Sequence, residues 1–265
     1  MAVTVVTRED AIISGMIMST AVSDAGLTDF HSHCLPNLDD GASDVAMAVA
    51  MLRADAQQGV DTVVATPHFY IGQHSVPTFL QDRQAAYEQL LPHLTEDMPR
   101  VLLGAEVLIR EGISRFDLRP LCLEGTDILL VEMPFSAPPY WLLEELERIV
   151  DTQGVTLMYA HLDRYLSWYS HNHFEMLMDL PDAIMQVNAD SIADKKYFGS
   201  LCRHLPDTRR MVLGSDMHNM DYRSPRMGQA VKVMSKSRDG RLWLERIVQM
   251  TERLERQVDN TEGLL

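Results

Sequence analysis

The stretch DILLVEMPF, residues 127–135, is a short apolar run that ends in one charged residue, Glu132. Its length and its branched apolar residues are typical of a buried strand. Six further runs share this build, so about seven strands are expected. They are GLTDFHSH (26–33), DTVVATPHF (61–69), RVLLGAEV (100–107), VTLMYAHLDRY (155–165), AIMQVNADS (183–191) and RMVLGSDMHN (210–219).

Longer amphipathic stretches lie between most of these runs and are expected to be helices. Strands that alternate with helices this often predict an α/β fold with a mostly parallel sheet, open or closed into a barrel. No linker divides the chain, so we expect one domain, residues 27–265, after an extension, residues 1–26, that is loosely ordered or forms a short helix. The expected helices are residues 44–59, 79–94 and 140–154, and a C-terminal helix that packs Trp243, Ile247, Met250, Leu254 and Val258 into the core.

The composition excludes several classes of partner. The 265 residues carry a net charge of −15 and no basic cluster, which argues against nucleic acid and anionic membranes as partners. No apolar run approaches the length of a transmembrane helix, so no membrane insertion is expected. Three cysteines without a CxxC pair do not form a disulfide framework, and they fit a cytoplasmic location best.

Polar residues end strand after strand in this pattern. In parallel α/β folds the carboxyl ends of the strands form the active site, so these side chains are expected to meet. One of them alone proves little, because a lone strand-end histidine such as His68 is usually structural and Glu106 could be an ion-pair partner. Together they are costly to bury without cations, which predicts a site for two or three metal ions. The candidate ligands are His31, His33, Asp40, His68, Glu106, Glu132, His161, Asp216 and His218.

The ligand types indicate the metal and the reaction. Imidazoles and carboxylates without a thiolate suit Mn²⁺, Fe or Zn²⁺. Closely spaced ions of this kind are suited to hydrolytic phosphoryl transfer. Arg164 and Arg223 follow the fifth and seventh runs, where they could bind phosphate or form plain surface ion pairs. The position of Arg164 directly behind a strand makes it the stronger candidate.

The pair His33-Cys34 raises the alternative of a cysteine phosphatase. That chemistry needs an arginine six positions after the nucleophilic cysteine. Asp40 stands there after Cys34, and neither Cys122 nor Cys202 has an arginine at this spacing. Thiolate chemistry is therefore not expected.

With these residues assembled, the chain resembles the polymerase and histidinol phosphatase (PHP) superfamily. It is most similar to the bacterial PHP-type protein-tyrosine phosphatases of capsule and exopolysaccharide operons. The resemblance covers about residues 27–228 and implies a distorted (β/α)₇ PHP-type barrel with a manganese-dependent cluster of three metal ions. It rests on DFHSHCLPNLDDGA, ATPHF, GAEV, LLVEMPF, AHLDRY, QVNADS and GSDMHN followed by DYRSPRM.

The resemblance also implies roles for the candidate residues. His31, His33 and Asp216 would hold one metal ion. Glu106 would bridge to a second ion, shared with Glu132 and His161, and Asp40, His68 and His218 would hold the third. Arg164 and Arg223 would hold the phosphate while a metal-bridging hydroxide attacks phosphorus and expels the tyrosine phenolate. The implied partner is a phosphotyrosine protein, the Tyr-rich tail of a capsule tyrosine kinase.

Two features depart from the family pattern. The family commonly has a glutamate where this chain has Asp163, and the shorter carboxylate bears on how Arg164 is held. The N-terminal extension is also atypical.

Two other functions remain open at this point. The same fold and metals could serve a small-molecule phosphatase of the histidinol-phosphate type. A non-catalytic metal-binding regulator is the third possibility, but it predicts a missing ligand or phosphate-binding arginine, and the chain lacks none of them.

Overall fold

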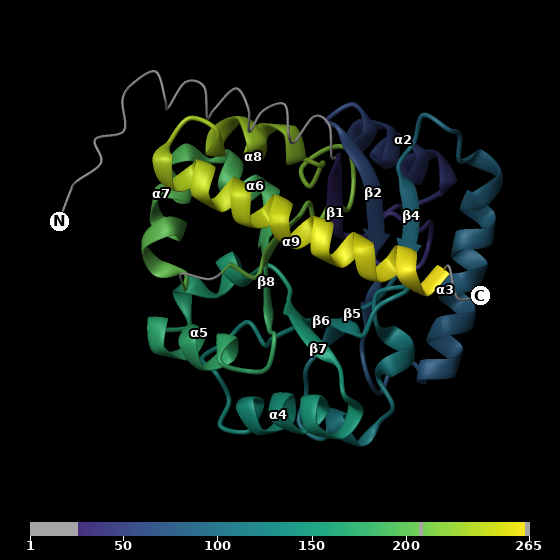
Figure 1. Ribbon diagram of the computed structural model, residues 1–265. Coiled ribbons are helices and arrows are strands. Elements are labelled where there is room, and N and C mark those ends of the chain that lie inside the picture. The colour runs from purple at the N-terminus through teal and green to yellow at the C-terminus, as the bar shows by residue number, and fades with distance from the viewer. Residues whose placement is uncertain (1–25, 207–208, 263–265) are drawn as a thin grey trace.

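The computed structural model describes residues 26–206 and 209–262. In this part of the chain all strand pairs are parallel. Helices surround the strands, and the long C-terminal helix α9 lies across them in Figure 1. The predicted extension, residues 1–26, lies almost wholly outside the described residues.

The seven expected runs are all present, but two of them are bent and are therefore divided. The second run gives β2 and β3, which are separated by Thr66 and Pro67, and the third gives β4 and β5, which are separated by Gly104 and Ala105. The strands thus form a three-stranded sheet, in the order β1-β2-β4, and a six-stranded sheet, in the order β3-β5-β6-β7-β8-β9. The strands are β1 (Leu27–Ser32), β2 (Val60–Ala65), β3 (His68–Phe69), β4 (Arg100–Leu103), β5 (Glu106–Leu108), β6 (Ile128–Glu132), β7 (Thr156–Tyr159), β8 (Ile184–Asn188) and β9 (Met211–Gly214).

The two sheets meet again where β9 returns to β1. Ser32 forms a parallel bridge with Met217, and the amide of Asp216 donates to the carbonyl of His31 at 2.7 Å. Each bent run also carries the chain from one sheet into the other. The arrangement confirms the predicted distorted seven-run barrel, and it accounts for the distortion by the two bends.

The predicted helices are present with small changes at their ends. Residues 79–94 were expected to be one helix, but α3 begins at Val76, where Ser75 caps it and Pro77 fits its first turn, and it ends at Leu90. The α-helices are α2 (Val45–Ala56), α3 (Val76–Leu90), α4 (Leu142–Gln153), α5 (His171–Met178), α6 (Ala189–Ala193), α7 (Lys195–His204), α8 (Met227–Met234) and α9 (Arg238–Glu262), and the 3₁₀ helices are Leu91–His93, Ile113–Arg115, Arg119–Leu121 and Leu162–Ser167.

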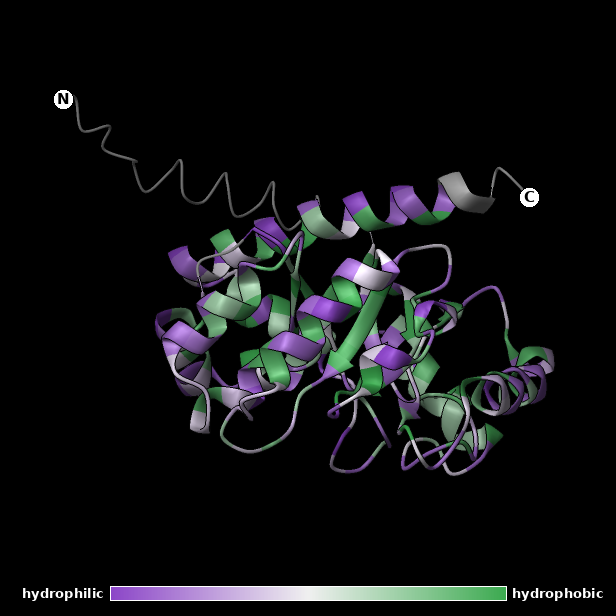
Figure 2. Ribbon diagram, turned by 90° about the horizontal axis from the view of Figure 1, so that it is seen from below, coloured by the Kyte–Doolittle hydropathy of each residue, from purple (hydrophilic) through white to green (hydrophobic). Residues whose placement is uncertain are grey.

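The barrel interior is an apolar layer that α9 closes from the amino ends of the strands. Met250, Leu254 and Val258 of α9 pack into the same cluster as Phe30 of β1, and all are buried. Figure 2 shows the strands as a hydrophobic centre among helices of mixed character. This confirms that the apolar face of the C-terminal helix is core.

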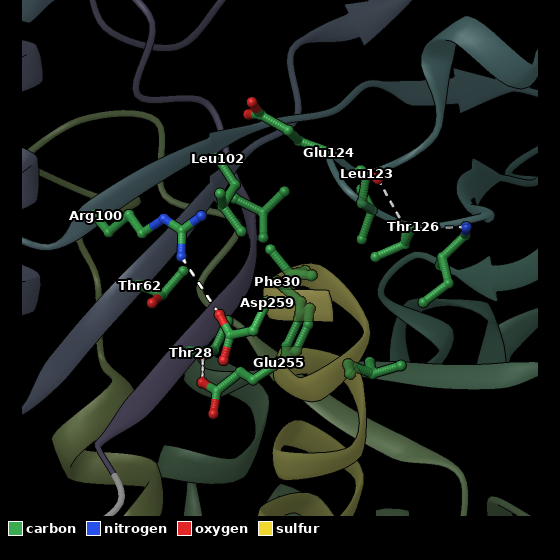
Figure 3. A pocket seen from close by; sticks show the side chains of 14 residues that line it. Thr28, Phe30, Thr62, Arg100, Leu102, Leu123, Glu124, Thr126, Glu255 and Asp259 are labelled. Atoms are coloured by element: carbon green, nitrogen blue, oxygen red, sulfur yellow. Dashed lines mark hydrogen bonds and ion pairs between the residues drawn. The ribbon is translucent and has the colours of Figure 1, made fainter. Parts of the chain in front are cut away.

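Polar contacts at the edge of that layer attach α9 to the first sheet. Figure 3 shows the small cavity there, with Thr28 donating to Glu255 at 2.6 Å and Arg100 within 3.9 Å of Asp259. These contacts and the apolar packing fix α9 at the amino end of the barrel, so the carboxyl ends of the strands stay open for a site.

None of the helices in the described residues combines the length and the apolar character needed to cross a membrane.

Candidate metal centre

The nine predicted ligands lie together at the carboxyl ends of the strands. His31 and His33 come from β1 and the residue after it, and His68, Glu106 and Glu132 come from β3, β5 and β6. All but His68 and Asp40 of the nine are buried. The strand-end pattern therefore brings together the side chains that the sequence predicted.

Two of these residues adopt an unusual backbone conformation. His161 and Asp216 have φ values of +34° and +52°, in the left-handed region that residues other than glycine rarely adopt. Each is the second residue after a strand, β7 or β9, at the edge where the site lies. Backbone strain of this kind is concentrated at functional sites, because the surrounding structure must hold it in place.

Ligand atoms converge in three overlapping groups. Within each group, one nitrogen or oxygen per residue lies within 4.8 Å of those of the others. The groups are His31, His33 and Asp216; His33, Asp40, His68 and His218; and His68, Glu106 and Glu132. The first group has the composition that the family resemblance implied. In the third, His68 joins Glu106 and Glu132, and His161 instead hydrogen-bonds Glu106 at 2.8 Å.

Side chains outside the nine orient the first two histidines. Asp39 accepts from Nδ1 of His33 at 2.7 Å, and Gln186 Oε1 lies 3.0 Å from Nδ1 of His31. These partners leave the Nε2 atoms, 3.1 Å apart, facing Glu106 and Asp216. Such anchoring of the distal ring nitrogen is the usual support for a metal-binding histidine.

A hydrogen-bonded chain extends this support across the site. The amide of Gln186 donates to Asn188 Oδ1 at 2.9 Å, and Asn188 Nδ2 donates to Asp216 Oδ2 at 3.0 Å. The same Gln186 oxygen accepts from the backbone N–H of His161 at 2.6 Å. Strand β8 therefore holds ligands from three other segments in a fixed relation.

Glu106 lies at the centre of the cluster. Burial would raise the pKa of Glu106, but the positive charge of His31 and hydrogen bonds from His161 and His31 hold it well below its usual range. Burial, followed by repulsion from Glu106, raises the pKa of Glu132 to about 7. Glu106 is thus firmly ionised, whereas burial and the nearby charge of Glu106 leave Glu132 only partly ionised at neutral pH.

The cluster leaves ligand atoms without a well-formed hydrogen bond. Glu106 Oε2, His161 Nδ1, His68 Nδ1 and His218 Nε2 are buried and form no hydrogen bond among the described residues, although His68 Nδ1 lies 2.9 Å from Glu106 Oε2 and His218 Nε2 lies 3.2 Å from Asp40 Oδ1. Unsatisfied buried polar atoms are costly, so a cluster of them indicates a group that would satisfy them. A set of imidazoles and carboxylates at this density fits divalent metal ions.

Both candidate arginines reach the cluster through the same carboxylate. Arg223 donates to Asp216 Oδ1 at 2.6 Å, and Arg164 forms an ion pair with Oδ2 of the same residue. Their side chains are 28% and 33% exposed, so they line the open side of the site. They are therefore not plain surface pairs, because each faces a proposed metal ligand.

Asp163 does not contact Arg164 in the way that its position in the motif suggested. It is buried and accepts from the backbone N–H of Asn188 at 2.9 Å and from Ser191 Oγ at 2.6 Å. The shorter carboxylate thus joins the segment after β7 to β8 and α6, and Arg164 turns to Asp216.

The cysteine beside His33 is unsuited to nucleophilic attack. Cys34 is fully buried, and burial raises the pKa of its thiol to about 12. The thiolate would be scarce at neutral pH, which agrees with the missing arginine in the sequence.

Asp39 and Gln186 were not among the predicted site residues. Asp39 stands next to Asp40, so only the tertiary contact shows which of the two carboxylates turns toward His33. Gln186 lies inside the sixth run, where a polar residue in an apolar strand was the available signal.

Comparison with known proteins relates the chain to one family. Residues 27–252 match the family model for capsular polysaccharide synthesis, CpsB/CapC. Tyrosine-protein phosphatase YwqE of Bacillus subtilis (strain 168) is 29% identical over 218 residues, which cover 79% of this chain and 84% of that protein. Tyrosine-protein phosphatase CpsB of Streptococcus pneumoniae is 27% identical over 228 residues, which cover 79% of this chain and 90% of that protein.

A solved structure shares the fold. It belongs to the crystal structures of YwqE from Bacillus subtilis and CpsB from Streptococcus pneumoniae, described as unique metal-dependent tyrosine phosphatases. The match has a TM-score of 0.69 and 24% sequence identity, and it covers 88% of this chain and 95% of the other. At this identity the similarity establishes the barrel fold.

Proposed function

Since this chain belongs to the CpsB/CapC family of capsular polysaccharide synthesis, we propose that it is a metal-dependent protein-tyrosine phosphatase. The observation that carries the proposal is the convergence of five histidines and four carboxylates with two arginines at one end of the barrel. Phosphate-ester hydrolysis needs a cluster of positive charge and an activated water, and this residue set fits both.

The nine converging residues would hold the metal ions. We assign His31, His33 and Asp216 to one ion, and Asp40, His68 and His218 to another. Glu106 lies within 3.4 Å of His31, His33, His68 and His161, so it would be the ligand shared between ions, with Glu132 beside it. Bound divalent ions, Mn²⁺ in our proposal, would lower the pKa of a bound water molecule and offset the negative charge of the phosphoryl oxygens.

The arginines would bind the substrate phosphate. A guanidinium donates several N–H groups in a plane and matches phosphate oxygens. Arg164 and Arg223 contact the two different oxygens of Asp216, so together they can hold two phosphate oxygens and orient the phosphoryl group. Both also stabilise the charge that develops on those oxygens in the transition state.

The leaving group makes few demands on the protein. The tyrosine phenolate has a pKa of about 10, so it can leave without a strong general acid. The proposed substrate is a phosphotyrosine protein, the Tyr-rich tail of a tyrosine kinase in capsule or exopolysaccharide synthesis, in the cytoplasm. We assign the activity to a PHP-type metallophosphatase domain, residues 27–265.

Metal removal and restoration test the proposal. Purified protein is treated with a chelator, assayed on a phosphotyrosyl peptide, and assayed again with Mn²⁺, Fe²⁺ or Zn²⁺ added. Turnover that disappears and returns with Mn²⁺ is the expected result. Histidinol phosphate is assayed in parallel, because metal-dependent turnover of that substrate alone would assign the site to small-molecule metabolism. Cys34→Ser serves as a control that keeps every proposed ligand.

A further inference from the structure

A groove of about 590 Å³ opens beside the metal centre. Glu132, one of the proposed ligands, lies in its lining, so the groove is continuous with the site. Tyr70, Phe135 and Trp141 contribute aromatic side chains, and Arg110 contributes a cation. The groove thus combines flat apolar surface with one positive charge next to the site of the reaction.

Two of the aromatic rings are stacked on proposed metal ligands. The ring of Tyr70 stacks on His68 with centroids 5.1 Å apart, and Phe135 stacks on His161 at 5.5 Å. Phe135 also contacts Tyr165 and Trp168, with ring centroids 5.1 and 5.8 Å away, but it is 44% exposed, so part of the ring is available to a ligand. Aromatic rings held this way are preorganised for stacking against another ring, with little loss of side-chain freedom.

Arg110 is exposed and forms no ion pair or side-chain hydrogen bond with any residue that the structure describes. The chain carries a net charge of −15, so an unpaired cation at this groove is a local exception. A free guanidinium at the rim of a binding groove is suited to an anionic side chain of a partner.

We propose that this groove binds the aromatic ring of a phosphotyrosyl peptide, with Phe135 as the stacking surface, and that Arg110 binds an acidic residue beside the phosphotyrosine. The inference rests on the proposed phosphatase function and extends it to substrate selection. The phosphate would lie at the metal centre, and the ring and the flanking peptide would lie along the groove. Phe135 and Arg110 are therefore specificity-determining residues.

Ring binding is tested without turnover. Isothermal titration calorimetry on the Mn²⁺-loaded protein compares inorganic phosphate with phenylphosphonate, in which a phenyl ring replaces one phosphate oxygen. Phe135→Leu keeps apolar bulk but removes the ring, and Phe116→Leu is the control, because Phe116 is equally exposed at 47% but lies outside the groove. We expect Phe135→Leu to weaken phenylphosphonate binding about fivefold and phosphate binding less than about twofold.

The proposed binding of an acidic residue by Arg110 is tested with two peptides, which carry either aspartate or asparagine next to the phosphotyrosine. We expect wild-type kcat/KM to favour the aspartate peptide, and Arg110→Ala to reduce that preference about fivefold. Arg253 is an exposed arginine on α9 that pairs with none of the described residues, so Arg253→Ala should keep the wild-type preference.

The outcomes separate the two proposals. If Phe135→Leu loses equal affinity for phosphate and phenylphosphonate, the assignment of the ring to the groove is wrong even when peptide hydrolysis is intact. If Arg110→Ala keeps the aspartate preference, the assignment of the acidic residue to Arg110 is wrong. If the Mn²⁺-loaded wild type hydrolyses no phosphotyrosyl peptide, the proposed function is wrong. A Phe135→Leu defect confined to phenylphosphonate would still establish that the groove binds an aromatic ring.

Discussion

Arg223 donates a hydrogen bond to Asp216 across 2.6 Å, and these two residues lie on the same loop only seven positions apart. Asp216 is a proposed metal ligand and Arg223 a proposed phosphate-binding residue. Arg164 holds the other oxygen of the same carboxylate. The metal site and the phosphate site therefore share one side chain, so they are expected to be coupled.

The arginines can be separated from metal binding by mutation. Arg164→Ala is expected to raise KM for a phosphotyrosyl peptide and to lower kcat/KM about 100-fold, because a charged donor to the phosphate is lost. The metal content, measured by mass spectrometry of the purified protein, should stay at the wild-type value. A loss of metal in proportion to the loss of activity would instead make Arg164 a support for Asp216.

Replacement of a ligand histidine is the stricter test of the metal centre. His33→Ala should lower turnover by at least about 1000-fold, since His33 belongs to two of the three ligand groups. His171→Ala, at the exposed histidine that begins α5, is the matched control and should keep full activity. Circular dichroism should show an unchanged fold in both variants. A fully active His33→Ala protein would contradict the proposed centre.

Cys34 should be dispensable for activity and should react slowly with alkylating reagents. Cys34 is fully buried, whereas Cys122 and Cys202 are partly exposed, so iodoacetamide at pH 8 should modify those two thiols before Cys34. Cys34→Ser should hydrolyse the peptide within about twofold of wild type, because the mechanism does not use the thiolate. Peptide mapping and initial rates measure the two effects. An inactive Cys34→Ser variant with normal metal content would reopen the cysteine mechanism.

The buried pair Asp29 and Asp55 should make stability depend on pH. Burial, and then the charge of Asp29, raises the pKa of Asp55 well above its usual range. A carboxyl group whose pKa is higher in the folded protein than in the unfolded chain stabilises the fold at pH values below its unfolded pKa. This stabilisation is lost as the pH rises through the pKa of the folded state. Asp55→Asn should therefore flatten the decline of the free energy of unfolding above about pH 4.

Urea denaturation from pH 4 to pH 8 measures this slope for wild type and variant. Arg53 is exposed and lies two positions before Asp55. Arg53→Ala is therefore the control and should keep the wild-type dependence of the free energy of unfolding on pH. Parallel curves for Asp55→Asn and wild type would show that Asp55 titrates normally.

The closure of the barrel by α9 should contribute stability without contributing to the reaction. Leu254 is 3% exposed inside the interior cluster, and Leu254→Ala should lower the free energy of unfolding by about 2–5 kcal/mol. Arg253→Ala, its exposed neighbour, should change it by less than about 0.5 kcal/mol. Chemical denaturation measures both. Activity per folded molecule should not change in either variant, because α9 lies at the opposite end of the barrel.

Several features were predictable because they depend on local pattern. The apolar runs ending in His31, Glu132 or Asp216 indicated strands. Because the carboxyl ends of parallel strands lie at one edge of the sheet, the residues that end these runs were expected to lie together. The C-terminal helix was predicted from the spacing of its apolar residues, and its burial is confirmed. The bends in the second and third runs were not predicted, because an apolar run looks the same whether it continues in one sheet or crosses into another.

The order of residues along the chain determined which side chains would end strands, and hence the chemistry available at the carboxyl edge of the barrel. Only the tertiary structure decided how those side chains are oriented. Gln186 supports His31 from 155 residues away, and Arg164 and Arg223 come from separate loops to one carboxylate. Such contacts form when burial brings distant polar groups together and each must find a partner, a requirement that no local spacing in the sequence expresses.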